Sequence, residues 1–264
     1  MSKENLASIA AKLTGIIPPI TMPFDQSGNL VPSAIAEQVN FMVEQGVHGM
    51  VAGGSTGEGH TLNDADFTTS MRAVHDAIDG RVPFLAGLII NSTRAAIERV
   101  QMLKGMNIAA LQVTPVHYLF KPSADATVQH FRTIWEETGI PIIIYNVVPW
   151  NYLSCDLMLR IMDEVPGVIG MKQSAGDLKL VSDLLHRMKP ENVVLTGTDA
   201  LLYPAFSLGV HGAISALTSA VPGLTVKLWD LVKAGDHKAA LDLHYRIADL
   251  WDVLPHDNLP ACVK

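Results

Sequence analysis

Short apolar runs alternate along the chain with stretches of helical periodicity. The apolar runs, which we expect to be strands, lie near 16–21, 48–53, 83–89, 108–113, 141–146, 167–172, 193–197 and 212–216. Between them, stretches that suit amphipathic helices lie near 33–46, 64–79, 93–105, 124–138, 155–164, 177–188 and 200–208. Strands that alternate with helices indicate βαβ units and a parallel sheet.

Eight such units in about 220 residues predict a (β/α)8 TIM barrel, an α/β fold. Three helix starts carry capping residues: Asn63 and Asp64 precede one helix, Ser92 or Thr93 the next, and Ser123 the one after. A doubly wound open sheet is the alternative, but it typically shows a Gly-x-Gly-x-x-Gly turn after its first strand, and 22–25 reads Met-Pro-Phe-Asp. We therefore predict a barrel at 1–220 and a short C-terminal helical extension at 221–264, with helices near 222–234 and 236–253.

Composition narrows the class of protein. The chain has 264 residues, 48% of them hydrophobic and 17% charged, which suits one large domain with much buried surface. Its net charge of -7 argues against nucleic acid as a partner. Cys155 and Cys262 form neither a metal spacing nor a disulfide framework, which favours a cytoplasmic protein. No apolar run is long enough for a membrane span, and 1–5 does not resemble a signal peptide.

The carboxyl ends of barrel strands carry the active site in TIM barrels, so polar residues there are the candidates. Lys172 ends the apolar run 168–172, where burial disfavours a charged ammonium and favours a nucleophilic amine. Such an amine forms a Schiff base with a ketone. The alternative is a lysine without a catalytic role, which extends to solvent or pairs with an acid.

Two more strand ends support this chemistry. The turn 54–58, Gly-Ser-Thr-Gly-Glu, offers the hydroxyls of Ser55 and Thr56 and several backbone amides to a carboxylate. Tyr145 closes the run 142–144, and its phenol could relay protons during imine formation and C–C cleavage. Alone, the turn could be a plain βα connection and the tyrosine a core residue; beside Lys172 the catalytic interpretation is stronger.

The remaining signals are weaker. His117 and Tyr118 follow the fourth strand, and either could be a second proton relay or ordinary loop packing. No His-Glu-x-x-His cluster and no phosphate-binding Gly-x-x-x-x-Gly-Lys-Ser/Thr motif is present, so we expect neither a metal nor a bound cofactor.

At these positions the chain resembles the dihydrodipicolinate synthase / N-acetylneuraminate lyase family of Schiff-base pyruvate aldolases. The resemblance runs from Gly15 to Lys264 and is carried, in order, by 54–58, 145–146, 170–173 (Gly-Met-Lys-Gln), 197–199 (Gly-Thr-Asp) and 212–215 (Gly-Ala-Ile-Ser). The family folds as a (β/α)8 barrel with a helical extension and is commonly a tetramer, a dimer of dimers.

The resemblance also implies roles for residues. Lys172 would form the imine with pyruvate, and Tyr145 would shuttle protons. Ser55 and Thr56 would hold the carboxylate, with Thr56 extending the relay. Gly197 and Ile214 would shape the pocket through backbone carbonyls, and Tyr118 would resemble a tyrosine lent across a subunit interface.

Differences between this sequence and the family pattern bear on which substrate is bound. Dihydrodipicolinate synthases usually carry an arginine shortly after the catalytic tyrosine, and 145–152 contains none. Neuraminate lyases usually carry an acid after the aspartate of the seventh strand, and here Ala200 follows Asp199. Family members also run one or two helices further, so this chain is either short or lacks its tail.

The sequence therefore predicts a class I aldolase or lyase that joins or cleaves pyruvate and an aldehyde. Trp150 and Tyr152 suggest an apolar or sugar-stacking pocket, which fits a 2-keto-3-deoxy sugar acid. The alternatives are 4-hydroxy-tetrahydrodipicolinate synthase, a Schiff-base dehydratase of a deoxy-sugar acid, and a non-catalytic barrel that senses a keto acid.

Overall fold

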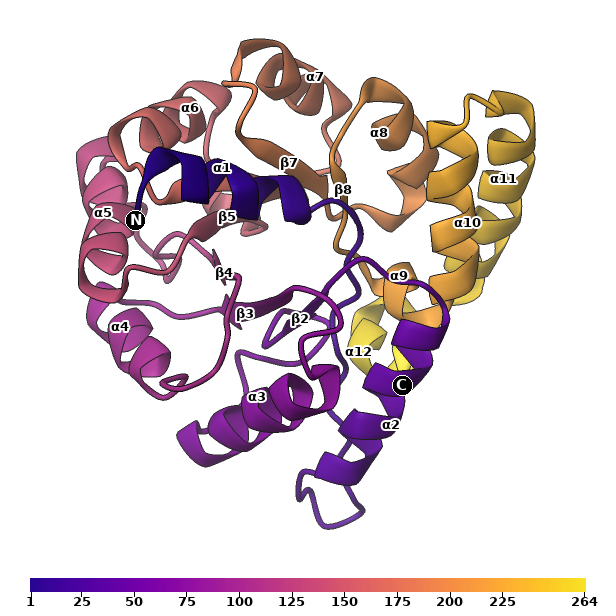
Figure 1. Cartoon of the computed structure of the whole chain (residues 1–264), viewed down its shortest axis with the longest axis horizontal. Coiled ribbons are helices and arrows are strands. Elements are labelled where there is room, and N and C mark those ends of the chain that lie inside the picture. The colour runs from indigo at the N-terminus through magenta and orange to yellow at the C-terminus, as the bar shows by residue number, and fades with distance from the viewer.

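Eight parallel strands form one curled sheet at the centre of the molecule (Figure 1). A computed structural model describes all of residues 1–264. The strand order is β1-β8-β7-β6-β5-β4-β3-β2. The strands are β1 (Gly15–Ile16), β2 (Met50–Ala52), β3 (Phe84–Leu88), β4 (Ala110–Val113), β5 (Ile142–Asn146), β6 (Val168–Gln173), β7 (Val193–Thr196) and β8 (Gly212–Ala213). Each lies within one of the predicted apolar runs or within one residue of it, so the predicted TIM barrel is confirmed.

Backbone hydrogen bonds beyond the short first strand close the barrel between β1 and β2. Pro19 bridges Val51 in parallel register. The Val51 amide donates to the Pro18 carbonyl at 3.0 Å, and the Ile20 amide donates to the Val51 carbonyl at 2.8 Å. The sheet therefore has no free edge, and every strand has neighbours on both sides.

Helices surround the sheet, and three of them begin at capping residues that the sequence indicates. The first seven that follow a strand are α2 (Pro32–Glu44), α3 (Asp64–Ile78), α4 (Thr93–Gln101), α5 (Ala124–Thr138), α6 (Cys155–Glu164), α7 (Leu178–Arg187) and α8 (Leu202–Leu208). Asn63, Ser92 and Ser123 each accept a hydrogen bond from the amide three residues on, which satisfies a donor that the helix leaves unpaired. The predicted caps are therefore present.

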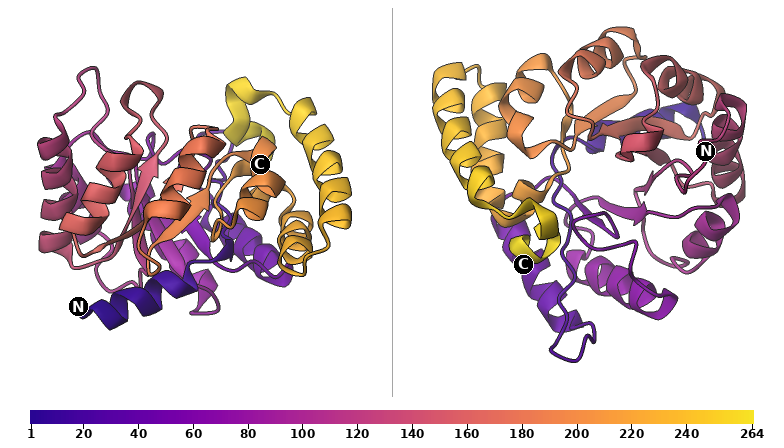
Figure 2. Two further views of the ribbon diagram at one scale, coloured as in Figure 1. Left: turned by 90° about the horizontal axis from the view of Figure 1, so that it is seen from above. Right: turned by 180° about the vertical axis from the view of Figure 1, so that it is seen from behind.

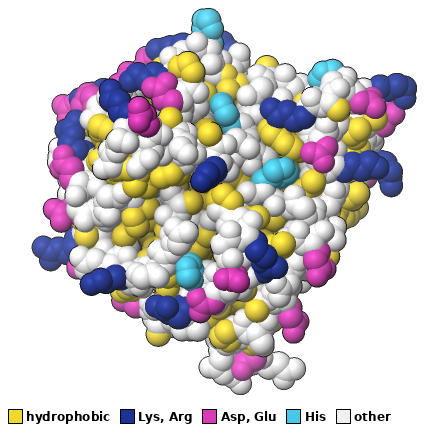
Figure 3. All heavy atoms as spheres, in the orientation of Figure 1, with side chains coloured by type: hydrophobic (Ala, Val, Ile, Leu, Met, Phe, Trp, Pro, Cys, Tyr) yellow, Lys and Arg dark blue, Asp and Glu magenta, His cyan; other side chains and the backbone are white.

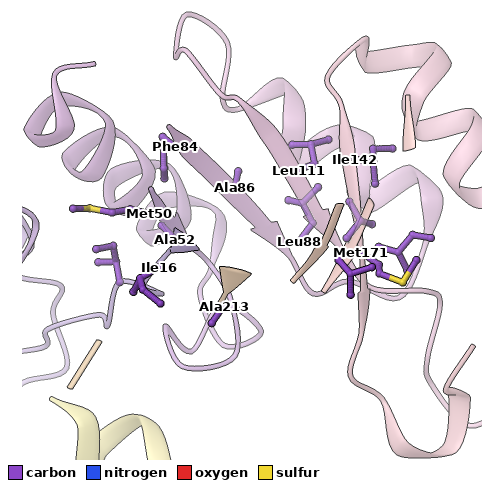
Figure 4. Close-up of a cluster of buried hydrophobic side chains, with 14 of the residues drawn as sticks. Ile16, Met50, Ala52, Phe84, Ala86, Leu88, Leu111, Ile142, Met171 and Ala213 are labelled. Carbon is purple, nitrogen blue, oxygen red and sulfur yellow. The ribbon is translucent and has the colours of Figure 1, made fainter. Parts of the chain in front are cut away.

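The hydrophobic core has an outer and an inner part. Side chains that point outward from the strands pack against the helices, and Figure 4 shows Ala86 and Leu88 of β3 beside Leu111 of β4 in this layer. A smaller cluster fills the inside of the barrel, with Ile17, Val51, Leu85, Ala110, Ile143, Ile169, Val193, Leu195 and Ile214. The barrel is thus filled by side chains at this level, as small barrels are.

A helix that we did not predict, α1 (Lys3–Lys12), closes one end of the barrel (Figure 2). Leu6, Ala10 and Leu13 pack against the inner cluster. The helix crosses the amino ends of the strands, so the carboxyl ends open at the opposite end. Any pocket for the strand-end residues must therefore open away from α1.

The last part of the chain is helical, as predicted. It contains α9 (Ala216–Ala220), α10 (Pro222–Lys233), α11 (His237–Val253) and α12 (Leu259–Val263). The suggested domain boundary at 220/221 stays a prediction, and α10, which lies beyond it, packs against β1 and α8 as well as α11.

On the face that carries α1, Lys and Arg side chains are scattered among Asp and Glu (Figure 3). None of the helices combines the length and the apolar character that a membrane span requires.

Candidate active site

Lys172 and Tyr145 lie side by side on neighbouring strands. They are paired in register on β6 and β5, and Lys172 Nζ lies 4.1 Å from the centroid of the Tyr145 ring. The Lys172 side chain is buried, with 5% of its surface exposed, and it makes no ion pair and no hydrogen bond. No acid immobilises this amine, so Nζ is free to attack a carbonyl.

A β-bulge turns Lys172 toward the inside of the barrel. Ile142 pairs with Val168, but Ile143 pairs with Gly170, so β6 carries one extra residue at Ile169. An extra residue reverses the inside and outside positions of the rest of the strand. Lys172 therefore faces the barrel interior like Tyr145.

The Gly54–Glu58 turn meets this pair through Ser55. Ser55 Oγ and Tyr145 Oη share a hydrogen bond of 2.9 Å, whereas the Thr56 hydroxyl makes none. The backbone N–H groups of Ser55, Thr56 and Gly57 donate no hydrogen bond within the chain. Successive free N–H groups in a turn form a concave site for an anion. The turn can thus bind a carboxylate beside the tyrosine, as its sequence suggests.

The register of the strands shows which inward side chains share a layer. A path from paired residue to paired residue that starts at Gly15 passes once around the barrel. It reaches β1 again at Pro23, eight residues after its start. Strands tilted in this way supply one layer of four side chains from every second strand. The layer of Lys172 also contains Val51, Gln112 and Ile214.

The next layer toward the carboxyl ends contains Tyr145 and two glycines, Gly87 and Gly197. A Cβ on Gly197 would lie 2.7 Å from Lys172 Cε and closer still to Ser174 Oγ. Glycine at this position therefore leaves the space that the lysine side chain uses. Ile214, which we expected to shape the pocket, is fully buried in the lysine layer.

Asp199 lies close enough to influence the charge of the site but does not pair with the lysine. Burial raises the pKa of Asp199, while backbone N–H groups and the Lys172 charge oppose the rise. Its carboxylate accepts hydrogen bonds from the amides of Leu217 at 2.6 Å and Ala216 at 3.3 Å. Asp199 thus fixes the start of α9 and leaves Lys172 unpaired.

The aromatic candidates lie on the rim. Tyr118 is 67% exposed and Trp150 is 62% exposed, whereas Lys172 is buried. The Trp150 indole N–H donates to the carbonyls of His117 at 2.9 Å and Tyr118 at 2.8 Å, so it joins the loops after β4 and β5. Burial raises the pKa of Tyr152, and the Tyr145 phenol adds to the rise, which places Tyr152 near Tyr145.

Sequence reasoning missed one buried polar residue of the site. Gln112, on β4, is fully buried in the lysine layer. The only signal in the sequence is an amide inside the otherwise apolar run 108–113. The structure contains no group of three or more His, Cys, Asp or Glu side chains that could hold a metal ion.

Comparison with known proteins places this geometry in a family. The sequence model of the dihydrodipicolinate synthetase family matches residues 12–264. A 4-hydroxy-tetrahydrodipicolinate synthase from Pseudomonas aeruginosa is 34% identical over 256 residues, which are 96% of this chain and 86% of that protein.

Solved structures agree with the sequence relatives. A prophage protein of the dihydrodipicolinic acid synthase family from E. coli K12, in complex with pyruvate, superposes with a TM-score of 0.89 at 26% identity, over 95% of this chain and 86% of that one. A sialic acid aldolase from Ruminococcus gnavus shares the fold, with a TM-score of 0.89 at 24% identity over 96% and 85%.

Proposed function

The chain belongs to the dihydrodipicolinate synthetase family, and from this premise we propose that it is a class I aldolase or lyase that joins or cleaves pyruvate and an aldehyde. The observation that carries the proposal is the lysine itself. Lys172 is buried, free of any acid partner, and 4.1 Å from the ring of Tyr145. A buried amine in this setting costs free energy without a structural return, which is typical of functional sites.

The reaction follows from these groups. Lys172 Nζ attacks the keto carbon of the substrate, and the carbinolamine loses water to give an iminium ion. In the cleavage direction the 4-hydroxyl loses its proton, the C3–C4 bond breaks, and its electron pair moves to the iminium as an enamine while the aldehyde leaves. Protonation of C3 and hydrolysis then release pyruvate and the free amine. Tyr145 is the group placed to carry these protons.

The two hydroxyls of the turn after β2 have different roles. Ser55 is hydrogen-bonded to Tyr145 at 2.9 Å, so we assign Ser55 as the relay partner, a role that the family resemblance gave to Thr56. Thr56 and the free N–H groups of the turn are left for the keto-acid carboxylate. Bonds to a carboxylate are charge-assisted and stronger than neutral ones.

We infer a neutral aldehyde partner from the loop after β5. Residues 145–152 carry no Lys or Arg, so this loop offers no bidentate partner to a second carboxylate. Tyr152 lies near Tyr145, and Trp150 holds the neighbouring loop by two hydrogen bonds. Aromatic side chains of this kind suit a hydroxylated chain, such as that of a 2-keto-3-deoxy sugar acid.

The names of relatives support a second candidate. Several relatives above 30% identity are 4-hydroxy-tetrahydrodipicolinate synthases, and their synthase reaction joins pyruvate to an aldehyde that bears a carboxylate. A Schiff-base dehydratase uses the same imine but expels a hydroxyl. Product analysis separates the three. Pyruvate plus aldehyde from a deoxy-sugar acid indicates an aldolase, and a dehydrated keto acid indicates a dehydratase. Condensation of pyruvate with aspartate semialdehyde, and with no sugar aldehyde, indicates the synthase.

We also propose that the enzyme is a homo-oligomer in the cytoplasm. Tyr118, Leu119, Phe120 and Trp150 form an exposed apolar patch beside the active-site mouth, and contiguous patches of this kind mark interaction surfaces. A second copy on this patch would bring aromatic side chains to the rim of the site. Both cysteines are unpaired, which suits a reducing compartment.

Borohydride trapping with pyruvate tests the proposed function. We expect one adduct, located on Lys172 by intact mass and peptide mapping. Lys172→Met should lose the adduct, and Lys104→Met, at an exposed lysine far from the site in sequence, should keep it. A folded wild-type protein that gives no adduct would remove imine chemistry and bring the keto-acid sensor forward.

A further inference from the structure

Gln112 is a buried amide without a partner in the middle of the barrel. None of its surface is exposed, and neither Oε1 nor Nε2 has a hydrogen-bond partner in the chain. A buried polar group that lacks a partner costs free energy, whereas an apolar side chain of the same shape does not. The fold therefore gains nothing from an amide at this position, and a ligand is the natural partner.

The amide points toward the carboxylate-binding turn. Gln112 shares the layer of Lys172, and its Nε2 lies 3.6 Å from the position a Cβ on Gly54 would take, immediately before Ser55. Its register partner on β3 is Gly87, which has no side chain to cover it. Nε2 thus reaches from the lysine layer up to the backbone of the turn.

We propose that Gln112 is a further substrate-binding residue, whose amide donates a hydrogen bond to the carboxylate of the keto acid. This inference rests on the proposed function, because it assumes that a keto acid is held between Lys172 and the turn. The turn supplies hydroxyls and N–H groups on one side of the carboxylate. Gln112 supplies a donor on the side that faces the barrel interior.

A neutral donor suits this position for an electrostatic reason. A lysine or arginine here would also bind a carboxylate, but it would place a second cation in the layer of Lys172. An acid would repel the carboxylate and pair with the amine. An uncharged donor holds the substrate anion without forming an ion pair with the amine and without adding a charge to this layer.

The test compares a charged and an uncharged ketone. The half-saturating concentration for borohydride trapping on Lys172 is measured with pyruvate and with methyl pyruvate, in wild type and in Gln112→Met, which keeps the length of the side chain. One hydrogen bond to a charged group corresponds to a rise of about 10- to 100-fold for pyruvate. Methyl pyruvate should change by a clearly smaller factor, about 2- to 10-fold, because its uncharged ester carbonyl accepts a weaker hydrogen bond.

Thermal stability gives an independent readout. Removing an amide that has no partner should raise the melting temperature of Gln112→Met without ligand, by about 2–4 °C for a chain of this size. A merely structural glutamine would give a lower melting temperature and an equal loss with both ketones. Either that pattern or an unchanged half-saturation with pyruvate overturns the proposal.

Two further variants serve as controls for the loss of the Gln112 donor. Gln112→Glu keeps the shape but replaces the donor with an acid, so pyruvate should bind more weakly as the pH rises; unchanged binding would overturn the proposal. Gln173→Met removes an equally buried amide on the outward face of β6, and its half-saturation should not depend on the charge of the ketone. Absence of trapping in wild type would instead reject the proposed function, and the inference with it.

Discussion

Replacing Gly197 with alanine should disable the lysine without unfolding the protein. The new Cβ would lie 2.7 Å from Lys172 Cε, and an ordinary contact begins near 3.4 Å. The lysine side chain must therefore retreat by about 0.7 Å, and Ser174 must move as well. Misplacement of a reacting group by about 1 Å costs on the order of 100-fold in rate. We expect kcat for the lyase reaction to fall by about that factor.

Gly223→Ala is the matched control for this variant. Its Cβ would meet only the flexible end of the Gln45 side chain, which can move away. Turnover and the rate of borohydride trapping on Lys172 are measured in both variants, with urea unfolding as the stability check. Normal turnover in Gly197→Ala, or a loss of activity that merely follows a loss of stability, would refute the steric reasoning.

Tyr145→Phe keeps the ring beside Lys172 but removes the phenol, so turnover should fall by about 10²- to 10⁴-fold, and Ser55→Ala should lose less; equal losses in stopped assays of product would contradict the relay. Burial lowers the pKa of His130 to about 4; since its unfolded value is near 6.5, the unfolded state binds more protons between these values, and stability should fall by about 3 kcal/mol as pH drops from 6.5 to 4. Urea midpoints at pH 7.5 and 4.5 should show a smaller drop in His130→Gln, and parallel curves would argue against this residue. Trp150→Phe loses the two bonds between the rim loops, so KM for the aldehyde should rise several-fold while half-saturation with pyruvate stays constant.

The sequence predicted the barrel well because buried parallel strands are short continuous apolar runs and the helices carry clear caps. It did not predict α1, because that helix contacts the core through Leu6, Ile9, Ala10 and Leu13, a narrow stripe among alanines and charged residues. It also extended the eighth strand into α9, because Ala216 and Leu217 continue the apolar run of β8. In both cases tertiary contacts, rather than local pattern, decide the element.

The sequence predicts the geometry of the candidate site less well than it predicts the fold. Strict alternation from Ile169 would direct Lys172 to the outside of the barrel, and only the bulge in β6 brings it inside. A bulge leaves no reliable mark in the sequence, so the position of Lys172 at a strand end was predictable while the direction of its side chain was not. Similarly, two adjacent hydroxyls precede Gly57, and only the backbone of the turn decides that Ser55 reaches Tyr145.

Stability and chemistry are separated along the axis of this barrel. Below the lysine layer, apolar side chains and α1 fill the interior, which is the arrangement that stabilises a small barrel. From the lysine layer upward, Gly87 and Gly197 remove side chains, and buried polar atoms without a partner lie at the carboxyl ends, those of Gln112, Ser174 and Ser215. Missing side chains and buried polar atoms without a partner thus occur together at one end of the barrel. Such departures from normal packing are expected where a protein binds its substrate. The apolar layers must therefore supply the free energy that the site costs, which is why substitutions such as Gln112→Met should raise stability as they weaken substrate binding.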